Sequence, residues 1–146
     1  LLKLFRELHG VVLNDEEAMQ LTERRNAISA ARAILDLGPT FVVVKKGEHG
    51  AGLVHQEGAA AIPAFPADEK QVIDPTGAGD SFAGGMMGHL AANGATDFRA
   101  IQTALAWGTV MASFTIESFS MDRLARLDQA QIDRRMADFR AAARVG

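Results

Sequence analysis

Apolar and polar positions follow two spacings along the chain, and the spacing predicts which segments are strands and which are helices. Short apolar runs bounded by turn residues are typical of strands, whereas apolar positions three and four residues apart are typical of one-sided helices. The predicted strands are residues 11–14, 41–45, 51–55, 59–63 and 71–73. The predicted helices are residues 1–9, 23–37, 97–113 and 128–143, with two more beginning after Asn14 and after Gly77. In the helix at 23–37, the residues predicted to face inward are Ile28, Ala31, Ile34 and Leu35.

The composition is that of a globular domain and excludes several classes of protein. Apolar residues make up 48% of the chain and charged residues 23%, which is enough apolar material for a packed core. The formal net charge of −3 argues against a general nucleic-acid binder. The chain has no cysteine and no apolar run of about 18 residues, so we expect neither disulfides nor a membrane span. We therefore expect a cytoplasmic protein.

The stretch from Asp74 to Asp80 carries the strongest chemical signal. Its sequence, Asp-Pro-Thr-Gly-Ala-Gly-Asp, leads from an apolar run into a helix of small residues. At such a helix start, the amides of Gly77, Ala78 and Gly79 lack intrahelical acceptors and can point together at an anion. Asp80 then lies in the first helical turn beside that anion. A carboxylate in this position suits removal of a proton from a hydroxyl group while phosphate charge develops nearby.

A simpler interpretation is that this stretch is an ordinary turn. Asp80 would then stabilise a helix N-terminus by roughly 0.3–1 kcal/mol. The helix that follows argues against this interpretation, because it contains Gly84, Gly85 and Gly88 in its interior. Each of these glycines costs about 0.8–1 kcal/mol relative to alanine. Such glycines predict close approach of another backbone or of a ligand.

The motif, extended by Ser-Phe-Ala-Gly-Gly, resembles the C-terminal signature of the PfkB, or ribokinase-like, family of carbohydrate and nucleoside kinases. The resemblance implies an α/β fold, the ribokinase-like three-layer α/β/α sandwich, of which this chain would be the C-terminal portion only. It implies that Asp80 is the catalytic base. It also implies that the amides of Gly77, Ala78 and Gly79 form the anion hole for the phosphoryl group of ATP, with Gly79 also contacting the nucleotide.

A second segment agrees with the resemblance. Asn14 ends a predicted strand, and Glu17 follows three residues later, which is the spacing of a helix capping box. Capping alone would explain both residues. In the resembled family an Asn-x-x-Glu motif at this place organises Mg²⁺ and its waters, and Asn14 and Glu17 match that motif. Oxygen ligands acting partly through water are what a Mg²⁺ site offers.

A third segment is the strand at 41–45 with the turn that follows it. In the resembled family the end of this strand contributes backbone to the nucleotide site, and Gly47 matches the glycine found there. Lys45 and Lys46 replace the more usual Thr and Leu of ribokinase, so these lysines either face the ATP phosphates or lie in solvent. By the same resemblance, candidates for the adenine pocket are Trp107, Gly108 and Met111, although a tryptophan and a methionine at helical spacing are more often part of a core.

The resemblance also raises the question of a monovalent cation such as K⁺. Asp74 and Thr76 match motif positions whose groups help hold such a cation in the family. Residues 114–119 stand where many members complete that site, and here they depart from the ribokinase form. Potassium activation therefore stays open at this point.

Together these segments predict an ATP-dependent phosphotransferase that moves the γ-phosphoryl of ATP to a hydroxymethyl group of a sugar or nucleoside. We expect residues 1–146 to form a single, partial kinase domain that carries the ATP site and the base. We also expect this domain to be inactive by itself, because the family is about twice as long. The full-length protein is a candidate homodimer. The alternative is a nucleotide- or sugar-binding regulatory module of the same fold that has lost catalysis.

Overall fold

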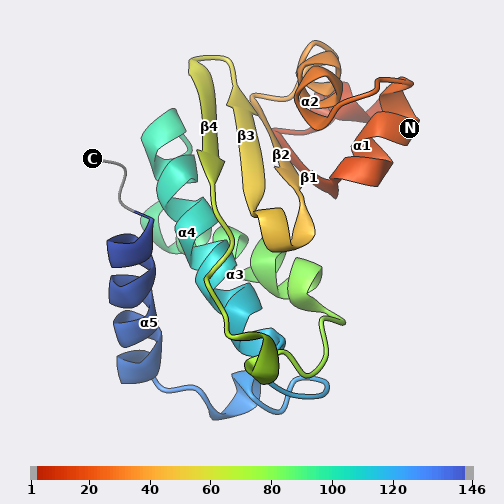
Figure 1. The fold of residues 1–146 in the computed structure, drawn as a ribbon. Helices are drawn as coiled ribbons and strands as arrows, with labels where there is room; N and C mark the ends of the chain where they lie inside the picture. The colour runs from red at the N-terminus through yellow and green to blue at the C-terminus, as the bar shows by residue number, and fades with distance from the viewer. Residues whose placement is uncertain (1–2, 144–146) are drawn as a thin grey trace. The chain divides into compact units, whose positions relative to one another are not determined.

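The computed structural model describes residues 3–143, and the chain folds into two compact units, Leu1–Pro63 and Ala64–Gly146 (Figure 1). We call them the N-terminal unit and the C-terminal unit, and each is described by itself. The assignment of all 146 residues to a single domain stays a prediction. Of the helix predicted over residues 1–9, the first two residues lie outside the described part, and Leu4–Glu7 form a short 3-10 helix with Phe5 buried.

The N-terminal unit is built on a four-stranded mixed sheet. Its strands are β1 (Gly10–Asn14), β2 (Phe41–Lys45), β3 (Ala51–His55) and β4 (Gly58–Ile62), in the order β1-β2-β3-β4. β1 and β2 are parallel, with Asn14 opposite Lys45, whereas β2–β3 and β3–β4 are antiparallel. The four strands predicted in this part of the sequence are therefore confirmed.

Two helices connect β1 to β2 and cover one face of the sheet (Figure 1). They are α1 (Asp15–Thr22) and α2 (Ala27–Leu35). A parallel pair of strands needs such a crossover, because a tight turn can only join antiparallel neighbours. The residues buried between helices and sheet include Leu13, Ala18, Ala30, Ala31, Ile34, Val42, Val44 and Val54.

The second helix begins later than its apolar spacing predicts. Residues 23–26 are not helical: Glu23 ends α1 in the left-handed conformation, with φ of 56°. Asn26 then caps α2, since its side chain accepts a hydrogen bond from the backbone N–H of Ser29. This cap moves the helix start to Ala27. Ile28, predicted to face inward, leaves 43% of its surface exposed.

The C-terminal unit consists mainly of three helices, α3 (Ala78–Asn93), α4 (Phe98–Thr115) and α5 (Gln129–Ala142). Asp97 and Asp128 cap the last two by accepting backbone N–H groups, so the predicted bounds are confirmed to within two residues. As for membrane spans, none of the helices within residues 3–143 combines the length and the apolar content that such a span requires.

The glycines of α3 have two different environments. A Cβ added to Gly85 would lie 2.7 Å from Met111 Cγ on α4, and a Cβ added to Gly108 on α4 would lie 2.7 Å from the Phe82 carbonyl oxygen. Close helix packing therefore explains Gly85, as predicted. At Gly84 and Gly88, the added Cβ would have no described atom within 4 Å apart from the adjoining residues and backbone of α3 itself.

The strand predicted at residues 71–73 is wrong. Gln71 ends a 3-10 helix, Glu69–Gln71, and the chain continues in an irregular conformation. The backbone N–H of Ile73 donates to the carbonyl oxygen of Ile116 at the end of α4, at 2.7 Å. An apolar run of three residues is too short to separate a strand from such a loop.

Candidate active site

The turn from Asp74 to Asp80, which we call the phosphate turn, is fixed at its start by backbone hydrogen bonds. The amides of Ile73 and Asp74 both donate to the Ile116 carbonyl, at 2.7 and 3.3 Å. A carboxylate oxygen of Asp74 accepts the backbone N–H of Thr76 at 2.9 Å. The end of α4 and the side chain of Asp74 thus set the path of the chain into α3.

Gly77 turns the chain into the helix. Its φ of 80° lies in the left-handed region, which glycine enters without the steric penalty of a Cβ. The first helical hydrogen bond then runs from the Ser81 amide to the Gly77 carbonyl, at 2.9 Å. A left-handed residue just before a helix aims successive amides toward one side, which is the geometry of an anion-binding nest.

The amides of this turn differ in their hydrogen bonding. Among residues 3–143, the amides of Gly77 and Gly79 have no hydrogen-bond acceptor, as the sequence predicts. The amide of Ala78 differs, because it donates to the Pro75 carbonyl at 3.1 Å. An anion bound here could share that N–H as a three-centre bond. The anion hole of Gly77, Ala78 and Gly79 stays a prediction.

Asp80 lies in the first turn of α3 and is exposed to solvent. Its carboxylate has no hydrogen-bond or ion-pair partner in the described part of the chain. The carboxylate is therefore available to a hydroxyl group that reaches the start of the helix.

Asp74 is held in its ionised form by its neighbour. The hydroxyl of Thr76, followed by the Thr76 backbone N–H, lowers the pKa of Asp74 below its usual value of 3.8. Both groups donate hydrogen bonds, which favour the carboxylate over the neutral acid. Asp74 is thus a carboxylate at neutral pH, as a candidate cation ligand must be.

Asn14 and Glu17 form a complete capping box at the start of α1. The Asn14 Oδ1 atom accepts the Glu17 amide at 2.7 Å, and the Glu17 Oε2 atom accepts the Asn14 amide at 2.9 Å. The capping role is therefore confirmed. Glu17 Oε1 takes no part in the box. The described residues contain no group of three or more His, Cys, Asp or Glu that could hold a metal ion. The Mg²⁺ role of Asn14 and Glu17 therefore stays a prediction.

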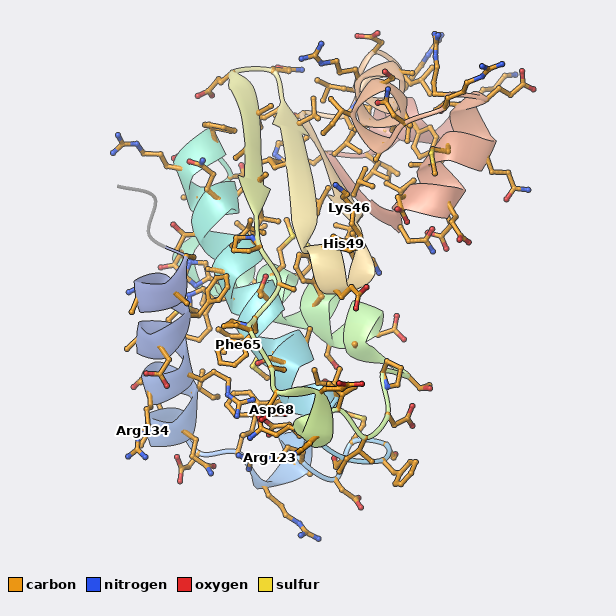
Figure 2. The ribbon with its side chains drawn as sticks, viewed as in Figure 1. Lys46, His49, Phe65, Asp68, Arg123 and Arg134 are labelled. Atoms are coloured by element: carbon orange, nitrogen blue, oxygen red, sulfur yellow. The ribbon has the colours of Figure 1, made fainter. Side chains whose placement is uncertain are left out.

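The ends of two parallel strands bring candidate residues together. Asn14 ends β1 and Lys45 ends β2, and the two are partners in the register of the sheet. Ligands of open α/β sheets bind at the carboxyl ends of such strands. Gly47 follows in the left-handed conformation, with φ of 55°. Lys46 and His49 flank this turn at the end of the sheet (Figure 2).

The predicted site residues thus fall into two groups. Asn14, Glu17, Lys45 and Gly47 belong to the N-terminal unit, and the phosphate turn belongs to the C-terminal unit. Among the candidates for the adenine pocket, Trp107 stacks on His89 of α3, with ring centroids 5.3 Å apart, and the pocket stays a prediction.

The residues that hold the start of the phosphate turn are not predicted from the sequence. Ile116 and Glu117 lie in the segment that departs from the ribokinase form, and Glu117 binds two arginines, Arg123 and Arg135. The sequence gives one indication for Arg135: it stands next to Met136, beside the apolar positions of the helix.

Comparison with known proteins identifies relatives of one kind. The sequence profile of the pfkB family carbohydrate kinases matches residues 1–124. A cytidine kinase from Thermococcus kodakarensis is 38% identical over 74 residues, which are 51% of this chain and 26% of that protein. An aminoimidazole riboside kinase from Salmonella typhimurium is 36% identical over 72 residues, 49% of this chain and 22% of that protein.

Solved structures share the fold. The aminoimidazole riboside kinase from Salmonella enterica, complexed with aminoimidazole riboside and an ATP analog, matches with a TM-score of 0.81 at 24% identity. This match covers 92% of the chain and 44% of the kinase. A fructokinase from Vibrio cholerae, in a form with fructose, ADP and calcium ion bound, matches with a TM-score of 0.75 at 26% identity, covering 88% and 41%. The ribokinase-like α/β fold is confirmed, and the chain spans less than half the length of these kinases.

Proposed function

Because the chain belongs to the pfkB family of carbohydrate kinases, we propose that it carries the ATP site and the catalytic base of a small-molecule kinase. The reaction is transfer of the γ-phosphoryl of ATP to a hydroxymethyl group of a sugar or a nucleoside. The observation that supports it most is the phosphate turn, where the unpaired carboxylate of Asp80 follows the amides of Gly77 and Gly79, which have no acceptor among the described residues.

Asp80 acts as the general base. Its carboxylate accepts the proton of the acceptor hydroxyl as the new O–P bond forms and the bond to the leaving ADP breaks. A positioned base of this kind contributes about 10²–10⁴-fold to the rate. A binding module gains nothing from an unpaired carboxylate beside a phosphate, which would repel it. The unpaired carboxylate of Asp80 therefore favours a kinase over the regulatory module.

The amides of Gly77, Ala78 and Gly79 stabilise the transferring group. Negative charge spreads over its equatorial oxygens in the transition state, and preorganised N–H donors interact with that charge without rearranging. Gly77 and Gly79 present their N–H groups directly, and Ala78 shares its bond with Pro75. The lack of Cβ atoms at the two glycines lets the phosphate approach the backbone.

The remaining candidates are assigned to ATP and its metal ion. Asn14 and the free Oε1 of Glu17 offer oxygen groups that fit Mg²⁺ held mostly through water and phosphate oxygens. Bound Mg²⁺ would neutralise charge on the β- and γ-phosphates. Lys45 and Gly47 are candidates for binding the nucleotide. Asp74 and Thr76 are candidates for a monovalent cation.

The decisive experiment assays ADP release by the full-length protein that carries this chain, against a panel of sugars and nucleosides. Asp80→Asn preserves the size of the side chain and removes its basicity. We expect acceptor-dependent turnover to fall by about 10²–10⁴-fold in this variant. Nucleotide affinity, measured by calorimetry, is expected to change little.

Asp133→Asn is the matched control, because Asp133 lies exposed on α5 outside the phosphate turn. We expect this variant to keep both turnover and affinity. Equal losses of turnover and affinity in Asp80→Asn would contradict the base assignment. Nucleotide binding without turnover on any acceptor would support the regulatory module instead.

A further inference from the structure

A cluster of charged side chains joins α5 to the end of α4. Glu117 follows Ile116, the C-cap residue of α4, and uses both carboxylate oxygens. Oε1 lies 2.6 Å from Nη2 of Arg135, and Oε2 accepts a hydrogen bond from Nε of Arg123 at 3.2 Å. We call these three residues the Glu117 cluster. The side chain of Glu117 is 20% exposed, that of Arg135 18% and that of Arg123 27%, so their charges are partly removed from water.

Aromatic rings hold the two arginines in place. The guanidinium carbon of Arg135 lies 3.7 Å from the centroid of the buried Phe114 ring, and that of Arg123 lies 5.2 Å from the same centroid. Arg135 also lies 5.2 Å from the ring centroid of Phe65 and donates to the Ser113 hydroxyl at 3.4 Å. Planar guanidinium groups combine ring stacking with carboxylate binding, which fixes their orientation. Phe65 and Arg123 are labelled in Figure 2.

This arrangement differs from an ordinary surface ion pair. Exposed pairs contribute about 0–1 kcal/mol, because solvent screens them and both side chains lose freedom. Here one carboxylate compensates two guanidinium groups that share an aromatic ring. Loss of Glu117 would leave two like charges side by side and partly desolvated, which is strongly unfavourable. The cluster therefore specifies one position for Glu117.

The position of Glu117 bears directly on the phosphate turn. The preceding residue, Ile116, provides the carbonyl oxygen that accepts the amides of both Ile73 and Asp74. That carbonyl belongs to the peptide bond that joins Ile116 to Glu117. A shift of Glu117 therefore moves the acceptor on which the start of the turn depends.

We infer that the Glu117 cluster positions the phosphate turn through the Ile116 carbonyl. Arg135 belongs to α5, beyond residues 1–124 that the family profile matches, so a helix outside that match supports the candidate catalytic loop. Glu117, Arg123 and Arg135 are positioning residues and do not touch the substrate. The catalytic consequence rests on the proposed function, whereas the positioning can be measured without nucleotide.

The test is amide hydrogen exchange, followed by NMR, on the 146-residue chain. Glu117→Gln and Arg135→Met remove the ion pair from opposite ends. We expect the amides of Ile73 and Asp74 to exchange about tenfold faster in both variants, because opening of the turn becomes easier. Amides in the middle of α3 and α4 keep their rates. Arg134→Met is the matched control, since Arg134 is the exposed neighbour of Arg135 and points away from the unit (Figure 2).

The double variant Glu117→Gln/Arg135→Met tests whether the two residues act on the turn through their mutual ion pair or by separate effects on stability. If the two residues act as one unit, the double variant exchanges no faster at Ile73 and Asp74 than either single variant. Unchanged exchange at these amides, or equal acceleration throughout α3 and α4, would overturn the inference. Arg135→Lys retains the charge and removes the planar stacking. If the other variants do not fold, the exchange of the Ile73 and Asp74 amides is compared with that of α3 and α4 in this variant.

A kinetic measurement on the full-length protein then connects the cluster with the reaction. In Glu117→Gln we expect kcat to fall about tenfold while the KM for ATP changes less than about twofold, as for a loss confined to the transition state. A fall in kcat that is matched by an equal rise in KM would overturn the catalytic part. Local exchange without any kinase activity in the unmodified protein would reject the proposed function and leave the positioning intact.

Discussion

At the scale of single residues, the two carboxylates of the phosphate turn, Asp74 and Asp80, have different surroundings. Asp74 accepts hydrogen bonds from Thr76 and shapes the backbone, whereas Asp80 has no partner among the described residues. A carboxylate oxygen that accepts a hydrogen bond from the turn has fewer lone pairs left for a substrate. A base must keep its lone pairs for the substrate, so the engaged residue is the structural one and the free residue is the candidate base.

The pH dependence of the turn follows from the lowered pKa of Asp74. A carboxyl group whose pKa is lower in the folded than in the unfolded chain stabilises the fold above its unfolded value. That contribution is lost as the pH falls below 3.8 and through the folded pKa. We expect an NMR titration of the Asp74 carboxyl carbon to show a midpoint below 3.8, with the Thr76 amide shifting in parallel.

Thr76→Val identifies the cause, because it removes the hydroxyl and retains the backbone N–H. The Asp74 midpoint is expected to rise toward 3.8 in this variant. Thr103→Val is the control, since the Thr103 hydroxyl bonds the Arg99 carbonyl on α4 and not the turn. An unchanged midpoint in Thr76→Val would show that the hydroxyl is not the source of the lowered pKa.

At the scale of elements, glycine has opposite effects in different positions of α3 and α4. Gly108 allows the helices to approach, because its added Cβ would lie 2.7 Å from the backbone oxygen of Phe82. We expect Gly108→Ala to lower the free energy of unfolding by about 1–3 kcal/mol, as overpacking does. Gly88 is exposed and open, so Gly88→Ala is expected to raise it by up to about 1 kcal/mol through helix propensity.

Urea unfolding of the two variants checks this contrast. Both substitutions add one methyl group to a helix, so each serves as the control for the other. A stabilising effect of Gly108→Ala would show that the helices separate easily and that their close contact is not required. A destabilising effect of Gly88→Ala would indicate that the outer face of α3 is covered.

The same scale shows what the sequence could predict. The starts of α4 and α5 are predicted correctly, because the caps Asp97 and Asp128 stand directly before the apolar spacing and are local signals. The start of α2 was placed too early, since the helical spacing continued through Glu23 and the cap at Asn26 was not used. The strand predicted at residues 71–73 is wrong, because the amides of Gln71 and Val72 donate to carbonyls only three residues earlier, in a local turn.

At the scale of the whole molecule, the candidate site was predictable where the chemistry is continuous in sequence. The phosphate turn and the Asn14–Glu17 pair each lie within a few residues, so their motifs were visible. The Glu117 cluster was not, because Glu117 and Arg135 meet only after α5 packs on α4. Tertiary contacts of this kind leave no periodic pattern in the sequence.

The edges of the sheet give a prediction for the behaviour of the whole chain in solution. In the described chain, β1 and β4 form the two edges, and β4 contains neither a charged residue nor proline. Uncharged edge strands offer unpaired backbone groups to other chains. We expect the purified 146-residue chain to self-associate as its concentration rises, and Ala61→Lys to weaken this, because Ala61 is exposed on β4.

Sedimentation velocity over a range of concentrations measures the effect. Gln56→Lys is the matched control: it adds the same charge in the exposed turn between β3 and β4 instead of on the edge strand. A weaker association in Ala61→Lys alone would locate the contact at β4. An equal effect of both substitutions would instead attribute the association to net charge, because the added lysine then acts wherever it stands. Association that neither substitution alters would leave β1 as the edge that pairs, since it is the other uncharged strand at the border of the sheet.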